Sequence, residues 1–152
     1  MKTKVVLVTL VVGLLAFLLA PNAPLTVWPK PAELMPPPTP TEINLFRLLG
    51  VFEALALGLG ISFLIFGWPL VEQVAAPSRG RAVAIYLSTA WLLGNWWLHD
   101  ALHMINGMKP TGLLGIEYGF HVTLMIAGAA LAYAFATMVT DGSISRAGVA
   151  RR

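Results

Sequence analysis

The chain contains no cysteine among its 152 residues. Disulfide bonds, thiolate metal sites and CxxC redox motifs are therefore all excluded. Any bound metal ion would have to be held by nitrogen, oxygen or thioether ligands. Glycine-rich phosphate loops, nucleophile elbows and HExxH motifs are also absent. No short motif therefore identifies a catalytic class.

Charged residues are scarce as well. They make up 11% of the chain, whereas a soluble domain carries about 25%. Hydrophobic residues reach 57% and the mean hydropathy is +0.76, so the composition favours a protein that lives in lipid. The few basic residues lie at chain ends and in loops rather than in a stripe interleaved with aromatics, which excludes nucleic acid as an expected partner. No internal repeat is evident, so residues 1–152 form one domain.

Long apolar segments account for most of the chain. The last three have 24 to 27 residues, enough to cross a hydrocarbon core of about 30 Å as helices. Together they predict an all-α fold, a four-helix transmembrane bundle in the cell membrane that crosses it several times. The four predicted spans cover residues 5–20, 43–68, 82–105 and 113–139.

The first apolar segment also resembles a signal peptide, because two lysines precede it. Cleavage after Ala20 or Ala23 would put Leu18 or Pro21 at the minus-three position. Signal peptidase prefers a small residue there. We therefore expect an uncleaved signal-anchor helix, whereas cleavage would leave three spans.

A proline-rich segment, residues 21–41, separates the first two spans and holds eight of the eleven prolines. Proline lacks the backbone donor and fixes φ, so regular helix or central strand is excluded there. We expect an extended cover over the outer face of the bundle, or else a docking strip for another subunit. Thr39, Pro40 and Glu42 predict a capping box that begins the second span.

The distribution of lysine and arginine predicts the orientation. Basic residues gather before the first span, between the second and third, and after the fourth. The positive-inside rule therefore places both termini in the cytoplasm, with the proline-rich segment and the 106–112 loop outside. The residues on the cytoplasmic side are Lys2, Lys4, Arg79, Arg81, Arg146, Arg151 and Arg152.

Polar side chains in the spans are sorted by depth. In the predicted topology they occupy the outer halves, while the inner halves hold only small polar groups. Ionisable groups inside a membrane are costly and indicate a functional site. A proton or ion transporter is less favoured, because it would need such groups through the full depth. The outer polar residues are Arg47, Glu53, Asn95, His99, Asp100, His103, Glu117 and His121.

Two pairs of these residues predict a metal site. His99 and His103 are four residues apart, as are Glu117 and His121, and a loop with glycine and proline joins the pairs. Residues four apart share a helix face, so a tight hairpin would direct all four at one point. Glu53 shares a face with two glycines and is expected to reach the interior as a fifth ligand or a base.

Imidazole and carboxylate ligands suit copper, zinc, iron or manganese. Met104 and Met108 would favour copper if their thioethers turned inward. Asp100 and Asn95 are expected to support the ligands rather than bind the ion. Haem b is the less favoured cofactor, because a short hairpin brings helices to about 8–10 Å and leaves little room for a porphyrin; ligation by His121 and a histidine of another chain stays open.

Two functions follow from these patterns. The first is a small integral membrane protein that holds a copper, zinc or iron ion at its extracytoplasmic side. The alternative is an accessory subunit of a larger membrane complex, respiratory, redox or haem-associated, with no chemistry of its own and with the polar groups serving as hydrogen bonds between helices. Gly115 and Gly119 form a GxxxG pattern that predicts close packing within the chain or between subunits. The expected partners are the lipid bilayer and other membrane subunits or further copies of the chain.

Overall fold

The computed structural model describes residues 2–33 and 37–149, with only the backbone described for residues 141–149. All regular secondary structure in these residues is helical, as expected from the sequence. The elements are α1 (Lys2–Leu19), α2 (Pro40–Phe66), α3 (Trp68–Ala75), α4 (Arg79–Asn106), α5 (Pro110–Ile116), the π-helix η1 (Glu117–Val122) and α6 (Thr123–Val149).

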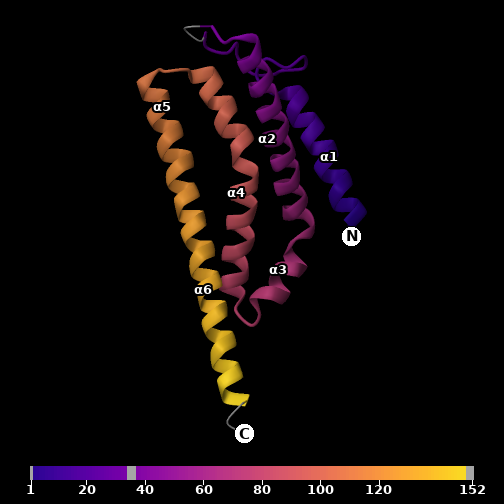
Figure 1. Cartoon of the computed structure of the whole chain (residues 1–152), viewed down its shortest axis with the longest axis vertical. Helices are drawn as coiled ribbons and strands as arrows, with labels where there is room; N and C mark the ends of the chain where they lie inside the picture. Colours follow the sequence, from indigo (N-terminus) through magenta and orange to yellow (C-terminus); the bar gives the residue numbers. More distant parts are fainter. Residues whose placement is uncertain (1, 34–36, 150–152) are drawn as a thin grey trace.

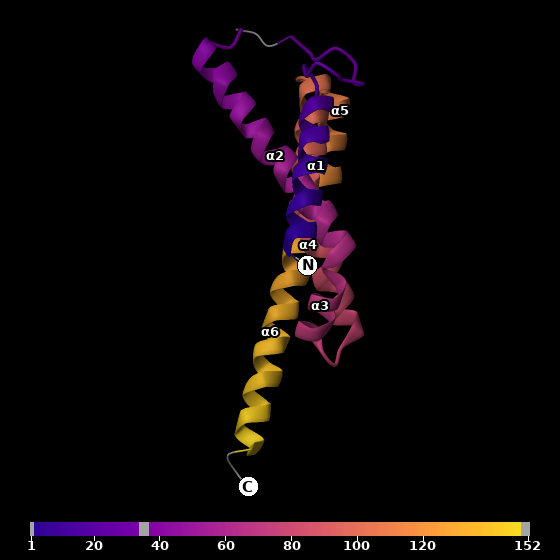
Figure 2. The same cartoon turned by 90° about the vertical axis from the view of Figure 1, so that its right-hand side faces the viewer.

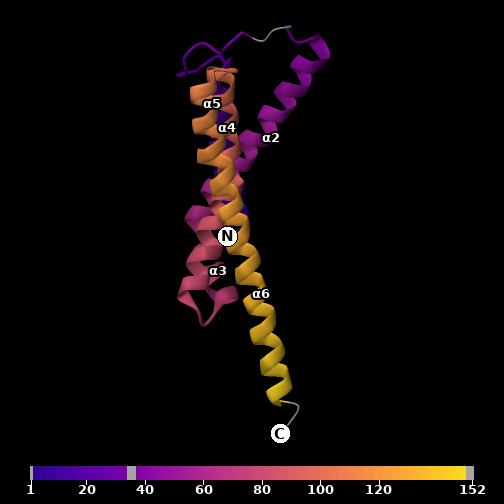
Figure 3. The same ribbon diagram turned by 90° about the vertical axis from the view of Figure 1, so that its left-hand side faces the viewer.

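The long helices lie in a row rather than around a common axis (Figure 1). Helix α2 packs against α1 and α4, and α6 packs against the opposite side of α4. Seen edge-on the molecule is narrow, except where the N-terminal half of α2 leans away from the other helices (Figures 2 and 3). Helix α4 is therefore the central element, and its two sides carry the contacts that position the polar residues.

Three helical stretches are long and apolar enough to cross a membrane. They are Lys2–Leu19, Pro40–Phe66 and Pro110–Thr140, with mean hydropathies of 2.2, 2.2 and 1.9. These stretches are compatible with a multi-pass membrane protein. Helix α4 is not among them, although the sequence predicts a span over 82–105 and the helix has 28 residues. The polar residues of its C-terminal half, such as Asn95, His99 and Asp100, lower its hydropathy.

Local sequence signals set the helix ends. Thr39 and Glu42 form the predicted capping box: the Glu42 amide donates to Thr39 Oγ1 at 3.3 Å, and the Thr39 amide donates to Glu42 Oε2 at 2.7 Å. Pro40 occupies the first turn, where no backbone donor is needed. This start of α2 is confirmed as the sequence predicts it.

A short helix that the sequence analysis did not anticipate, α3, follows α2. Pro69 lies in its first turn and interrupts the helical hydrogen bonds that would otherwise extend α2. Val71 and Ala75 of α3 are buried in an apolar cluster at this end of the molecule. The cluster also contains Ala82, Ile85 and Ala134, so it joins α3, α4 and α6.

The proline-rich segment lies over the opposite end, above the last turn of α4 (Figure 1). The Ala32 amide donates to the Met104 carbonyl at 2.9 Å. The Trp28 ring meets Trp97 edge-on, with 5.8 Å between centroids. Gly107 ends α4 with φ 57°, and a Cβ there would lie 2.7 Å from that of Ala32. Only glycine fits this turn, which lets the segment approach closely.

Candidate functional site

The three histidines and Glu117 lie together near the end of α4 that the proline-rich segment covers. His99 and His103 project from α4, and Glu117 and His121 project from η1, which packs beside α4 as part of the α5–η1–α6 rod. The ring centroid of His99 is 4.5 Å from that of His103 and 5.1 Å from that of His121. The structure therefore brings together the four residues that the two i, i+4 pairs single out.

Polar contacts connect these four side chains one after another. The Nε2 atoms of His103 and His99 are 3.1 Å apart. The same nitrogen of His103 is 3.8 Å from Glu117 Oε1, and the other carboxylate oxygen, Oε2, bonds His121 Nδ1. Glu117 thus lies between two imidazoles and can neutralise a positive charge on either of them.

Asp100 defines the orientation of His99. The His99 ring is 8% exposed, and its Nδ1 lies 2.9 Å from Asp100 Oδ1. A carboxylate can only accept, so Nδ1 carries a hydrogen and neutral His99 has a lone pair on Nε2. His103 then donates its Nε2 hydrogen to that lone pair. Asp100 presents His99 Nε2 to the cluster as an acceptor.

Glu53 reaches the cluster from α2, but behind Asp100. The Glu53 and Asp100 carboxyl groups are close enough to interact electrostatically. The contact therefore joins Glu53 to His99 through Asp100. Arg47, which lies between Glu42 and Glu53 on α2, is exposed on the part of the helix that leans away from the others (Figure 2).

Apolar and aromatic side chains close the inner side of the cluster. Phe120 is 8% exposed and its ring lies 5.4 Å from that of His99. Trp91 stacks on Phe120 at 5.8 Å between centroids. Asn95, one turn before His99 on α4, is 1% exposed; its amide nitrogen donates to the Trp91 carbonyl at 2.6 Å. Asn95 Oδ1 is buried without a hydrogen-bond partner.

The π-helix η1 carries Glu117 and His121. In a π-helix the backbone bonds run from i to i+5, so one residue more is accommodated per turn, and such turns often occur at functional sites. Thr123 stabilises this one: its hydroxyl lies 2.7 Å from the Gly119 carbonyl and 3.0 Å from that of Phe120. Trp91 Nε1 donates to the same hydroxyl oxygen at 3.0 Å, which anchors η1 to α4.

Within residues 2–33 and 37–140, no three His, Asp or Glu side chains are arranged as a metal-binding group. The imidazoles and carboxylates are instead connected by hydrogen bonds and by the 3.8 Å contact between His103 and Glu117. Met104 and Met108 are 41% and 84% exposed. Their thioethers therefore give no reason to prefer copper.

Two structural features were missed by sequence reasoning. The first is η1 with its Thr123 anchor, because a single wide turn leaves no periodic signal in a six-residue stretch. The second is a cavity beside Arg81, at the other end of α4. The sequence analysis used Arg81 only to predict the orientation of the chain in the membrane. The existence of the cavity depends on how α4 and α6 pack, and no local pattern shows that.

Comparison of the chain with protein-family models, curated proteins and solved structures finds no match.

Proposed function

We propose that the protein is a small integral membrane protein that holds one transition-metal ion at its extracytoplasmic side. His99, His103, Glu117 and His121 supply the ligands. The Glu53–Asp100 pair supports them from α2, and Glu53 moves in as a fifth ligand only if Asp100 releases it. The side chains already lie within one small volume, so binding requires rotation of side chains rather than movement of helices.

The single observation that carries this proposal is the spacing of the donor atoms. Zinc–nitrogen bonds of about 2.0–2.1 Å place two ligand atoms of a tetrahedral site about 3.4 Å apart. His99 Nε2 and His103 Nε2 are 3.1 Å apart, and Glu117 Oε1 is 3.8 Å from the latter. These values bracket the ligand–ligand distance, so small rotations of the side chains could bring the three donor atoms around one ion.

The surroundings of the ligands support the same proposal. A metal-bound histidine usually donates its second ring hydrogen to a carboxylate, which fixes the ring. His99 already has this arrangement with Asp100 at 2.9 Å. The unpartnered Asn95 Oδ1 is an acceptor that a water on the ion could satisfy; a buried acceptor left unpaired costs about 1–3 kcal/mol.

Contact between the histidine rings favours an ion over haem. At 5.1 Å between the centroids of His99 and His121, no porphyrin plane fits between them. Copper, zinc and iron all accept imidazole with carboxylate, and the donor set does not select one. Haem held by His121 and a histidine of another chain would need a second copy of the protein or a different subunit.

The proposal includes four membrane crossings with both termini in the cytoplasm. Helix α4 packs between two candidate spans, α2 and α6. At 1.5 Å per residue its 28 residues extend about 42 Å, longer than a hydrocarbon core. The polar side chains of α4 contact one another and Glu117 of η1, which lowers the cost of crossing.

Elemental analysis and an absorption spectrum of the detergent-purified protein test the function. We expect one metal ion per chain and no Soret band. Glu117→Ala and His121→Ala should each reduce metal content at least about tenfold, because each removes a ligand atom, whereas Asp100→Ala should weaken affinity and still reach full occupancy in excess metal. Glu72→Ala is the matched control, because Glu72 is an exposed carboxylate on α3 at the other end. Full metal content in both ligand variants would refute the site.

A specific observation keeps the accessory-subunit function as second candidate. A Cβ added at Gly115, Gly119 or Gly128 would meet nothing within 4 Å. The GxxxG pattern therefore makes no close contact inside the chain and is available to a helix of another subunit. Metal-free purified protein that also fails to bind added zinc, copper or iron would favour this candidate, with the polar cluster as a set of helix-to-helix hydrogen bonds.

A further inference from the structure

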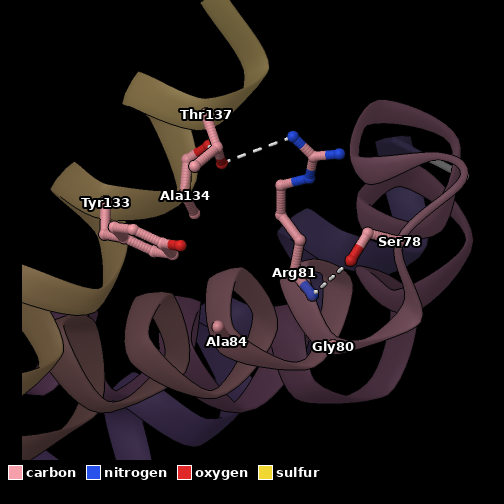
Figure 4. A pocket seen from close by; sticks show the side chains of 7 residues that line it. All are labelled: Ser78, Gly80, Arg81, Ala84, Tyr133, Ala134 and Thr137. Atoms are coloured by element: carbon pink, nitrogen blue, oxygen red, sulfur yellow. Dashed lines mark hydrogen bonds between the residues drawn. The ribbon is translucent and has the colours of Figure 1, made fainter. Parts of the chain in front are cut away.

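A cavity of about 290 Å³ opens between the first turns of α4 and the middle of α6, at the end of the molecule opposite the histidines. It is distinct from the polar cluster and shares no residue with it. Figure 4 shows the side chains that line it. The lining residues include Ser78, Arg81, Ala84, Tyr133, Ala134 and Thr137.

Hydrogen-bond donors are gathered on one wall of this cavity. Arg81 Nη1 donates to Thr137 Oγ1 at 3.3 Å, and the Thr137 hydroxyl donates to the Ala134 carbonyl at 2.9 Å. These bonds hold the guanidinium between α4 and α6 (Figure 4). A guanidinium has five donors and can serve several partners at once, and its planar fork matches phosphate oxygens. The Tyr133 side chain borders the same space and is 74% exposed.

The depth of the cavity matches that of lipid headgroups. Helix α3 and the first turn of α4 lie beyond the N-terminal end of α1, which begins a candidate span (Figure 1). Thr137 lies four residues before Asp141, where the apolar run of the sequence gives way to polar residues. The cavity therefore lies where the hydrocarbon core gives way to the polar zone, and the positive-inside rule puts this end at the inner leaflet.

Apolar neighbours indicate that the ligand is attached to acyl chains. Ala84 and Ala134 line the cavity, and Phe135, next to Ala134 in the sequence, is 53% exposed. A soluble anion would gain nothing from these groups, whereas a phospholipid would place its phosphate on Arg81 and its chains along α6. Basic recesses between helices at the cytoplasmic side suit anionic headgroups.

We propose that this cavity binds the phosphate of an anionic phospholipid from the inner leaflet. Arg81 pairs with the phosphate and the Tyr133 hydroxyl donates to its oxygens, while Thr137 holds the guanidinium in place. The bound lipid bridges α4 and α6 where α3 and the apolar cluster also meet them. Occupancy of this site is independent of whether the histidine cluster holds a metal ion.

Native mass spectrometry of the protein released from nanodiscs tests the proposal. The nanodiscs contain phosphatidylcholine with increasing phosphatidylglycerol. We expect one phosphatidylglycerol to remain on the wild-type protein and Arg81→Gln to weaken its retention about tenfold, as the loss of a charged hydrogen bond does. Tyr133→Phe, which preserves the ring, should weaken it less. Arg79→Gln is the matched control, because Arg79 carries the same charge in the same helix turn but lines a different cavity.

The outcomes separate lipid from soluble phosphate. Equal retention in wild type, Arg81→Gln and Tyr133→Phe would overturn the proposal, as would an equal loss in Arg79→Gln, which would indicate general attraction to charge. Displacement of the lipid by millimolar inorganic phosphate would show that the site takes the anion without its chains. Circular dichroism of Arg81→Gln checks that the helices persist, and Tyr133→Phe provides the test if they do not.

Discussion

The ionisable side chains of the polar cluster contact one another. His99 lies between Asp100 and His103, and Glu117 lies between His103 and His121. An ionisable group in a membrane is tolerated when it pairs with another or faces the interior. Both metal binding and simple helix-to-helix bonding would use these pairs. The decisive quantity is therefore stoichiometric metal, rather than the presence of the contacts.

At the same scale, Gly58 decides how closely α1 and α2 approach. A Cβ there would lie 2.2 Å from the Thr9 carbonyl oxygen, a backbone atom that cannot move aside. We expect Gly58→Ala to separate the helices and to lower the free energy of unfolding by about 1–3 kcal/mol, as overpacking does. Gly50→Ala in the same helix is the control, because a Cβ there meets nothing within 4 Å. Denaturation in detergent measures both; equal stability of the two variants would contradict the packing.

At the scale of the element, η1 sets the rotation of Glu117 and His121 relative to α6. Deleting Gly119 should restore an ordinary α-helix and place Glu117 and His121 three residues apart instead of four, which changes the angle between the two side chains. We expect the deletion to retain helicity and to lose bound metal. Gly119→Ala keeps the chain length and has open space for its Cβ, so it should bind metal normally. Circular dichroism measures the helicity and elemental analysis measures the bound metal. Metal retained by the deletion variant would show that metal binding does not need η1.

The elements also show what sequence can predict. The capping box of α2 was predictable because Thr39, Pro40 and Glu42 act within one turn. The meeting of the two i, i+4 pairs was predictable because a short loop joins them. Helix α3 was missed because its apolar residues continue those of α2, and only Pro69 marks the break. The Glu53–Asp100 contact depends on the crossing of α2 and α4, where Gly60 would bring a Cβ within 3.1 Å of Gly94; neither helix signals that register.

At the scale of the whole molecule, the single row of helices leaves much apolar surface without a partner in the chain. Helices α1 and α6 each have a neighbour on one side only (Figure 1). Large exposed side chains include Leu14 of α1 at 59% and Met125 of α6 at 66%. Lipid covers such surfaces well, and so does another membrane subunit. Contact with lipid and contact with another membrane subunit both agree with a composition of 57% hydrophobic residues.

The main prediction about the whole molecule is that α4 crosses the membrane. This 28-residue helix is not among the candidate spans that length and hydropathy identify. The chain has no cysteine, so a single introduced cysteine reports one position. Met108 follows α4 and is 84% exposed, and Gly80 lies in its first turn with open space at its Cβ. A membrane-impermeant maleimide should label Met108→Cys in intact cells and Gly80→Cys only in inverted vesicles. Labelling of both from one side would mean that α4 does not cross, and labelling of each from the opposite side would reverse the orientation and move the histidine cluster to the cytoplasmic face.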